Sequence, residues 1–290
     1  MRFALFGNTY QEKKSMAVQK FLAIAEQNKA EIVVQRPFYN FMKDRLNITL
    51  PDCEIIDNND FQADYVICMG GDGTFLDVAG KVGNKQIPII GFNTGRLGFL
   101  ASFLPEDIEY IIEDINNGEL LIEERSVLNV TSDDVDLGPM PFALNEVAVL
   151  KHDISSMIGI HTNIDHEYLT TYQADGLIVG TPTGSTAYSL SVGGPIMAPQ
   201  GNDILLTPVA PHSLNMRPIV LNDSAEVEIK VQSRSGSFLI AIDGRSKSYP
   251  DNTLIRIKKA DYKVKVVVKK SHSFYATLRK KMMWGVDNRF

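Results

Sequence analysis

The chain has 290 residues, of which 44% are hydrophobic and 22% charged, a composition typical of a globular protein long enough for two domains. Its formal net charge of −6 argues against general binding to nucleic acids or to anionic membranes. The two cysteines, Cys53 and Cys68, have no metal-ligand spacing, and so few in a chain of this length indicate a reducing compartment. The apolar runs are too short for a membrane-spanning helix or a signal peptide. We therefore expect a cytoplasmic protein.

The first part of the chain alternates short apolar runs with segments of helical periodicity. Strands that alternate with helices predict a parallel sheet, whose ligands bind beyond the carboxyl ends of the strands. We expect residues 1–118 to form a Rossmann-like α/β domain. Strands are predicted at 3–6, 31–35, 64–69 and 87–91, and helices after Ser15, around 38–46, from Thr74 to Val82, and from Pro105 to Gly118.

From about residue 119 the hydrophobic period changes from 3.6 to 2, which predicts a β-rich domain over residues 119–270. So many short strands in succession favour an all-β, sandwich-like fold. Asp165-His166 is a plausible hairpin turn, and Ser273 is expected to cap a C-terminal helix within 271–290 that returns to the first domain. Strands are predicted at 126–131, 143–150, 157–164, 167–172, 204–208, 225–231, 238–242, 254–258 and 264–268.

The central feature of the sequence is the loop Gly70-Gly71-Asp72-Gly73-Thr74, which follows a buried strand and precedes a helix. Its glycines permit positive φ and close approach of a ligand, and a helix N-terminus attracts phosphate. A carboxylate repels phosphate, so Asp72 is expected to meet a metal ion or a hydroxyl, which indicates phosphoryl transfer to an alcohol. The alternative is a strand-to-helix turn in which the glycines only allow the backbone conformation and bind no ligand. The loop lacks the lysine of the Walker pattern and the third glycine of the dinucleotide fingerprint.

Three other segments carry polar side chains in unusual places. A strand is predicted to run into the turn that starts near Thr181, followed by a short helix that carries Tyr188. The run from Thr181 to Tyr188 is rich in hydroxyls that suit ribose and base edges, although a capped turn would also use them. Asn145-Glu146 interrupts an apolar strand, which is costly if both are buried without partners; the alternative is that Asn145 faces solvent at a strand end. Asp243-Gly244-Arg245 is interpreted as a plain hairpin turn. The five histidines form no local chelate, so no metal ligand is assigned.

The central loop resembles the signature shared by NAD kinases, diacylglycerol and sphingosine kinases and, in variant form, phosphofructokinases. Other segments resemble NAD kinases in order and spacing, and the lipid kinases are not expected to carry the Thr-Pro-Thr-Gly run. These segments are 93–100, Asn145-Glu146, Asp175-Gly176, 181–188, 211–218 and the aromatic and basic tail at 273–284.

The resemblance implies a kinase that transfers the terminal phosphoryl of ATP, with Mg²⁺, to the adenosine ribose 2′-hydroxyl of NAD. Asp72 would be the base that accepts the hydroxyl proton, or would orient the metal-bound donor. Relatives often carry Gln at position 245, and Asp175 is expected to reach the ligand of a neighbouring subunit in a homodimer or homotetramer. The implied nucleotide contacts are Gly71, Gly73, Phe75, Asn145, Glu146, Asp175, Thr186, Ala187, Tyr188, Ser191 and Arg245; for Phe75 a core position is the alternative.

Two other functions remain open at this point. A lipid kinase of the diacylglycerol or sphingosine type would share the central loop, bind an apolar acceptor and be recruited to a membrane. A non-catalytic sensor of NAD(P) would keep the pocket but form no product, although the intact Asp72 argues against it.

Overall fold

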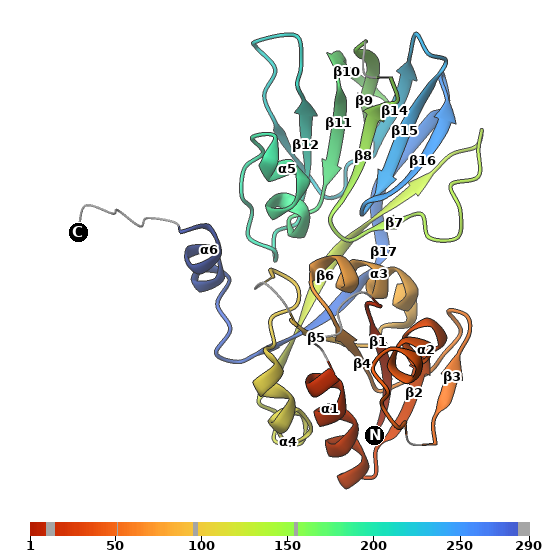
Figure 1. The fold of residues 1–290 in the computed structure, drawn as a ribbon. Helices are drawn as coiled ribbons and strands as arrows, with labels where there is room; N and C mark the ends of the chain where they lie inside the picture. Colours follow the sequence, from red (N-terminus) through yellow and green to blue (C-terminus); the bar gives the residue numbers. More distant parts are fainter. Residues whose placement is uncertain (10–14, 51, 95–97, 154–155, 284–290) are drawn as a thin grey trace. The chain divides into compact units, whose positions relative to one another are not determined.

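The computed structural model describes residues 1–9, 15–50, 52–94, 98–153 and 156–283 (Figure 1). They divide into two compact units. Unit 1 comprises Met1–Glu124 and Lys265–Phe290, and unit 2 comprises Arg125–Val264. The chain passes from one unit to the other along two long strands, β6 (Leu120–Thr131) and β17 (Leu254–Lys269), so each of these strands contributes to both units.

Unit 1 is built on a parallel sheet, in which the strands follow the order β17-β5-β4-β1-β2-β3. Helices alternate with these strands along the chain, as the sequence predicts. The strands are β1 (Arg2–Gly7), β2 (Glu31–Gln35), β3 (Glu54–Ile56), β4 (Tyr65–Met69) and β5 (Ile89–Phe92); the helices are α1 (Ser15–Gln27), α2 (Arg36–Asp44), α3 (Asp72–Val82), α4 (Ile111–Asn116) and α6 (Phe274–Met282), with 3₁₀ turns at Gly83–Lys85 and Pro105–Tyr110.

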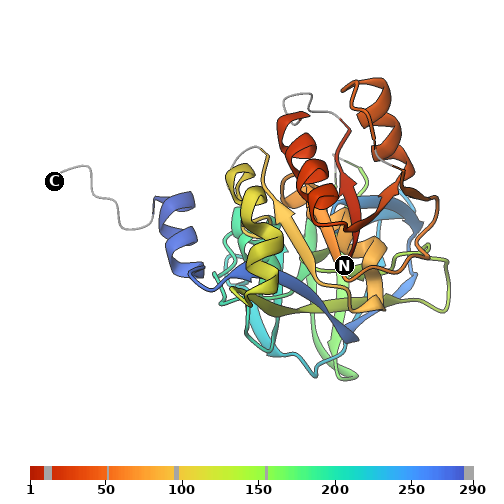
Figure 2. The same cartoon turned by 90° about the horizontal axis from the view of Figure 1, so that it is seen from below.

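Alternate residues of the unit 1 strands pack against helices on the two faces of the sheet. Phe3 of β1 points to the side of α1, where its ring meets Phe21 edge-on at 5.5 Å, and α1 lies beside α4 on that side (Figure 2). α3 covers the other face. A Cβ on Gly91 would come within 2.8 Å of the Phe75 ring, so a glycine in β5 lets α3 lie directly on the sheet.

Unit 2 consists of two antiparallel sheets with an apolar core that includes Val147, Ile160, Leu177, Ile229 and Phe238. One sheet has the order β10-β9-β14-β17 and the other β13-β12-β11-β8-β15-β16. This architecture confirms the predicted sandwich-like fold. Its elements are β7 (Phe142–Ala143), β8 (Glu146–Lys151), β9 (Ile158–Ile164), β10 (Glu167–Ala174), β11 (Gly176–Gly180), a 3₁₀ turn (Thr183–Thr186), α5 (Tyr188–Ser191), β12 (Asp203–Val209), β13 (Ile219–Asn222), β14 (Val227–Gln232), β15 (Ser237–Ile242) and β16 (Arg245–Pro250).

Several local predictions are confirmed. The Asp165-His166 turn joins β9 and β10, with φ values of 51° and 68° that suit a two-residue hairpin. Ser273 caps α6, because its hydroxyl accepts the Ala276 N–H at 3.3 Å.

Other local predictions need correction. Helix α3 begins at Asp72 rather than near Thr74, because Gly71 takes the extended conformation of an N-cap. The strand predicted at 143–150 is broken at Leu144-Asn145 into β7 and β8. The two strands predicted at 254–258 and 264–268 are one continuous strand, β17. The predicted helix after Pro105 starts as a 3₁₀ turn, and the short strands β3, β13 and β16 were not predicted.

Candidate functional site

None of Gly70, Gly71 and Gly73 has a positive φ. The central loop therefore uses these glycines because they lack a side chain, and not because it needs unusual backbone angles. A Cβ on Gly70 would overlap the Thr74 hydroxyl, which explains that glycine by packing alone. A Cβ on Gly71 or Gly73 would meet nothing within 4 Å. These two glycines therefore leave the N-terminus of α3 open to a ligand.

A pocket of about 600 Å³ opens beside these two glycines. It lies where β1, β2 and β4 end, which is the carboxyl edge predicted to bind ligands. We call it the loop pocket; its lining includes Gly7, Asn8, Gln35, Gly71, Gly73 and Lys81. Another pocket of about 770 Å³ lies between α1 and α4 and has no glycine loop or strand end in its lining, so size alone does not identify a site.

Backbone amides hold the Asp72 carboxylate. Oδ2 accepts the N–H of Phe99 at 2.8 Å, and Oδ1 accepts those of Leu100 and Ala101 at 3.0 and 3.1 Å. A Cβ on Gly98 would overlap this carboxylate, so the close approach requires glycine there. Each carboxylate oxygen has two lone pairs, so Oδ2 keeps one after its amide bond. The sequence did not predict these partners.

Helix α6 brings a lysine to the same carboxylate. Lys281 Nζ lies 3.6 Å from Asp72 Oδ2 and 4.3 Å from the ring centroid of Phe99. The Phe274 ring, at the start of α6, packs on Phe99 at 6.2 Å. Phe274, Leu278 and Lys281 are spaced i, i+4 and i+7, so they share one face of the helix. The basic and aromatic character of 273–284 was the signal in the sequence, but it did not single out Lys281.

Two expectations in unit 1 have different outcomes. The Phe75 side chain is fully buried with its ring against Gly91, which is the core position that the sequence left as the alternative. The sequence suggests either a phosphate contact or a loop salt bridge for Arg96, in the glycine-punctuated run 93–100, but this residue lies outside the described residues.

In unit 2, the backbone of Leu144, Asn145 and Glu146, which we call the 144–146 segment, binds a single carboxylate. Asp243 accepts the three N–H groups at 2.7, 2.8 and 3.1 Å, and its own N–H donates to the Glu146 carbonyl at 3.0 Å. Asn145 is only 8% exposed, so the alternative that it faces solvent is wrong.

The hydroxyl-rich run holds the 144–146 segment from another side. The Thr181 N–H donates to the Asn145 carbonyl at 2.9 Å, and the Thr181 hydroxyl donates to the Leu144 carbonyl at 2.6 Å. A Cβ on Gly184 would overlap the backbone of Asn145. Several hydroxyls of the run make local backbone bonds, as a capped turn would, but the buried Thr183 hydroxyl has no hydrogen-bond partner among the described residues.

Glu146 is the most perturbed carboxyl of this group. It is 9% exposed, and its Oε2 is buried without a hydrogen-bond partner among the described residues. Burial, followed by the negative charge of Asp243, raises the pKa of Glu146 to about 7, against a weaker opposing bond from the Tyr188 backbone N–H. Glu146 is therefore partly protonated near neutral pH, which suits a group that exchanges hydrogen bonds with a ligand.

The structure groups most of the other residues predicted in unit 2 around this segment. Thr186 ends the 3₁₀ turn that contains Gly184, Ala187 joins that turn to α5, and Tyr188 and Ser191 are the first and last residues of α5. Arg245 follows the Asp243 turn and donates to the Phe142 carbonyl at 2.9 Å.

Asp175 does not join this group. It precedes β11, in which Gly176 pairs with Leu150 and Gly180 pairs with Glu146. Five residues along the strand separate Asp175 from the Gly180–Glu146 pair, which corresponds to about 17 Å of backbone. Its carboxylate forms an ion pair with Lys151 at 2.7 Å.

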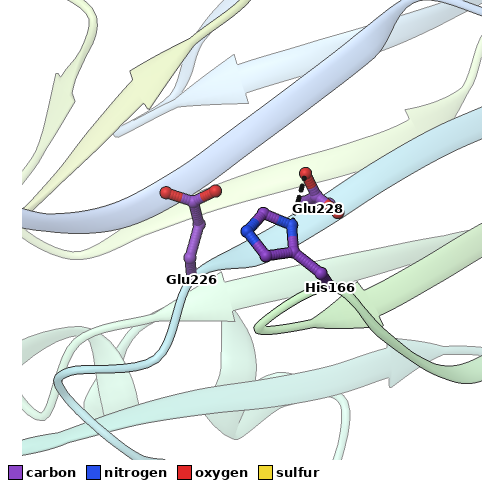
Figure 3. A group of neighbouring side chains, drawn as sticks. All are labelled: His166, Glu226 and Glu228. Atoms are coloured by element: carbon purple, nitrogen blue, oxygen red, sulfur yellow. Dashed lines mark ion pairs between the residues drawn. The ribbon is translucent and has the colours of Figure 1, made fainter.

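One further group contains three potential metal ligands that the sequence analysis missed. His166, Glu226 and Glu228 bring ligand atoms within 4.8 Å of one another (Figure 3). Glu228 Oε1 is already shared by His166 Nδ1 and Arg256 Nε, both at 3.4 Å. The guanidinium charge opposes a bound cation, so we interpret the group as an ion-pair network.

Comparison with known proteins decides the family. Residues 6–120 match the family description "ATP-NAD kinase N-terminal domain" and residues 144–269 match "ATP-NAD kinase C-terminal domain". An NAD kinase from Bacteroides fragilis is 55% identical over 289 residues, covering 100% of both chains. The chain belongs to the NAD kinase family. An NAD kinase from Porphyromonas gingivalis is 42% identical over 99% of each chain.

Solved NAD kinase structures share the fold. Yeast NADH kinase complexed with NADH superposes with a TM-score of 0.90 at 24% identity, covering 100% of this chain and 89% of the yeast chain. An NAD kinase from Archaeoglobus fulgidus in complex with ATP has a TM-score of 0.75 at 25% identity, covering 98% of this chain and 99% of the other.

These matches confirm the predicted family, fold class and ATP-dependent kinase activity, and they favour an NAD kinase over the lipid kinase and the non-catalytic sensor. None of the helices in the described part of the chain is long and apolar enough to cross a membrane.

Proposed function

We propose that this member of the NAD kinase family transfers the terminal phosphoryl group of ATP to the 2′-hydroxyl of the adenosine ribose of NAD, with Asp72 as the proton acceptor. A bond forms between the ribose oxygen and the γ-phosphorus, the bond from that phosphorus to the β–γ bridging oxygen breaks, and ADP leaves. The hydroxyl proton passes to Asp72. The observation that carries this proposal is the Asp72 carboxylate, held by three amides at the start of α3.

The hydrogen bonds of Asp72 favour a positioned acceptor over a strong base. Oδ1 is saturated by two amides, whereas Oδ2 keeps a lone pair for the ribose hydroxyl. The loose transition state of phosphoryl transfer needs alignment of donor and acceptor more than early proton removal. A carboxylate fixed by backbone bonds supplies that alignment at little entropic cost.

The loop pocket would hold the phosphates of ATP. Gly71 and Gly73 present backbone without side chains, and the free N–H groups of the eleven-residue helix α3 favour negative charge. Mg²⁺ would enter with ATP, since this ion is usually bound by substrate phosphates, waters and one or two carboxylates. Lys281 Nζ lies 3.6 Å from Asp72 Oδ2 and opposes a cation there, so the phosphates of ATP and water would supply the ligands of the ion.

The 144–146 segment would bind the dinucleotide. A carboxyl group such as Glu146 pairs well with vicinal ribose hydroxyls, and its buried, unpartnered Oε2 supports this role. Thr186, Ala187, Tyr188 and Ser191 supply further contacts from the run that holds the segment, and Arg245 supplies a charge near Asp243.

The distant position of Asp175 supports assembly of this chain into a homodimer or homotetramer. Because β11 separates Asp175 from Glu146, its contact with a dinucleotide would be to the ligand of a neighbouring subunit. Residues 1–118, 119–270 and 271–290 would act as the α/β domain, the dinucleotide-binding domain and a C-terminal helix returning to the first, in a cytoplasmic enzyme.

The test is NADP formation from NAD and Mg-ATP by the pure parent protein and by Asp72→Asn. An asparagine oxygen still accepts the Leu100 and Ala101 amides, so we expect a folded variant whose turnover falls by at least roughly 100-fold. Asp107→Asn is the matched control, because Asp107 also accepts a backbone amide, that of Leu104, at a helix start. Product from Asp72→Asn at the parental rate would overturn the proposed role, and no NADP from the parent would overturn the function.

A further inference from the structure

The turn between β15 and β16 does more than reverse the chain. Asp243 and Gly244 have φ values of 46° and 80°, as the predicted hairpin turn requires. The Asp243 side chain, however, points at the backbone of a segment 97 to 99 positions earlier and accepts three consecutive amides there. A turn that only needed its geometry would accept asparagine or glycine here equally well.

We propose that Asp243 is a positioning residue of the dinucleotide site, which fixes the 144–146 segment and controls the charge of Glu146. This inference rests on the proposed function of that segment. Asp243 itself need not touch the dinucleotide.

The first part of this role is mechanical. Three consecutive N–H groups that point to one spot form a concave, positively polarised site, and such a site is stable when an anion fills it. Asp243 is that anion, while Thr181 and Gly184 hold the opposite side of the same backbone. Without the carboxylate the three amides would lose their acceptors, and Glu146 would lose its fixed direction.

The second part is electrostatic. Asp243 is the charged group that faces Glu146; the Tyr188 backbone N–H approaches Glu146 from α5, and Arg245 and Tyr262 face Asp243. Burial and the Asp243 charge raise the pKa of Tyr262 to about 12, so it stays neutral across the physiological range. Burial also raises the pKa of Asp243, whereas its three amide bonds and Arg245 favour its ionised form. Burial is the larger cause of the raised pKa of Glu146, and the Asp243 carboxylate is the charged group that adds to it. Dinucleotide affinity should change with pH around 7 as Glu146 loses its proton.

Four proteins test this role: the parent, Asp243→Asn, Glu146→Gln and Asp165→Asn. Asp165 is a matched control, because it also occupies a hairpin turn with positive φ and accepts a backbone amide, that of Glu226, at 2.8 Å. The protonated carboxyl band of Glu146 is followed against pH by difference infrared spectroscopy without ligand. NAD affinity is measured by calorimetry over the same pH range, and KM and kcat are measured for NADP formation.

We expect the carboxyl band of Glu146 to titrate near pH 7 in the parent and in Asp165→Asn. In Glu146→Gln this band should be absent. In Asp243→Asn the midpoint should fall by about one pH unit, and KM for NAD should rise roughly tenfold with a smaller change in kcat. If Asp243→Asn does not fold, Asp243→Ser, which keeps an uncharged acceptor, replaces it.

A parental midpoint and parental NAD affinity in a folded Asp243 variant would overturn the inference, as would the absence of the Glu146 band near neutral pH in the parent. A parent that neither binds nor phosphorylates NAD would instead overturn the proposed function, and the infrared titration would still report on Asp243 and Glu146.

Discussion

Lys281 Nζ lies 3.6 Å from the Oδ2 atom of Asp72, the oxygen that also accepts the Phe99 amide. The same ammonium group lies over the Phe99 ring, so Phe99 contacts both partners of the ion pair. The side chains of Asp72 and Lys281 are 28% and 33% exposed, which places the pair between a solvated surface bridge and a buried one. Helix α6 therefore contributes directly to the surroundings of the proposed proton acceptor.

Replacing Lys281 by methionine should lower kcat by roughly three- to tenfold, because the carboxylate loses the cation that helps to hold it. Lys281→Arg should restore most of the rate, whereas Lys280→Met, at the exposed neighbouring position, should leave it unchanged. Steady-state kinetics with thermal unfolding as a check on folding would measure this. A parental kcat in a folded Lys281→Met variant would show that the ion pair has no part in the reaction.

Gly73→Ala should separate stability from activity. Position 73 lies in the first turn of α3, and a Cβ there meets nothing within 4 Å, so alanine should raise the free energy of unfolding by about 0.5 kcal/mol. The added methyl group would project toward the loop pocket and should raise KM for ATP several-fold. Asn84→Ala, an exposed position outside that pocket, is the control in urea unfolding and kinetics. An unchanged KM would argue against phosphate binding at Gly73.

Gly184→Ala should damage the dinucleotide site through the backbone. Its Cβ would overlap Asn145, and since backbone atoms cannot move aside cheaply, we expect a loss of roughly 2 kcal/mol in the free energy of unfolding and weaker NAD binding. Gly180→Ala is the matched control, because its Cβ would meet neighbouring atoms no closer than 3.8 Å. Equal effects of the two substitutions, measured by urea unfolding and calorimetry, would contradict this account.

Glu146 should make stability depend on pH in a direction opposite to that of most carboxylates. The pKa of Glu146 is about 7 in the folded protein, above its ordinary value of 4.5. The stability that protonated Glu146 contributes to the fold is therefore fully present below pH 4.5 and is lost as the pH rises through about 7. The loss amounts to about 3 kcal/mol at most. Glu146→Gln should flatten the parental decline over this window, whereas Glu228→Gln should not, because Asn163 and His166 outweigh the effect of burial and lower the pKa of Glu228. Parallel curves for parent and Glu146→Gln would refute the prediction.

Local patterns predicted much of this molecule. The apolar runs, the Asp165-His166 turn and the Ser273 cap each depend on residues within a few positions, and all three agree with the structure. The place of the central loop at the carboxyl edge followed from the alternation of strands and helices.

The side-chain partners could not be predicted, because they are far apart along the chain. Asp72 binds amides 27 to 29 positions later in the chain. Those amides belong to a loop, and its residue types do not indicate where its backbone N–H groups point. The break at Leu144-Asn145 likewise depends on the distant Asp243 and Thr181, whereas the local sequence favours one continuous strand. Hydrophobic periodicity predicts which face of a helix or strand a residue occupies, but it does not identify the distant residue that packs against that face.

The pairing of β17 with β5 has a consequence for synthesis on the ribosome. Phe103 bridges to one end of the outer edge of β5, and Val266 of β17 pairs with Ile89 further along that edge, so this part of the edge is covered by residues that emerge last. While the 172 residues between Phe92 and Lys265 are being translated, at roughly 5–20 residues per second, this part of the edge has no native neighbour and can pair with other nascent chains. A stop codon just before residue 265 would leave this exposure permanent, so the truncated chain should aggregate even though it contains all of Met1–Glu124.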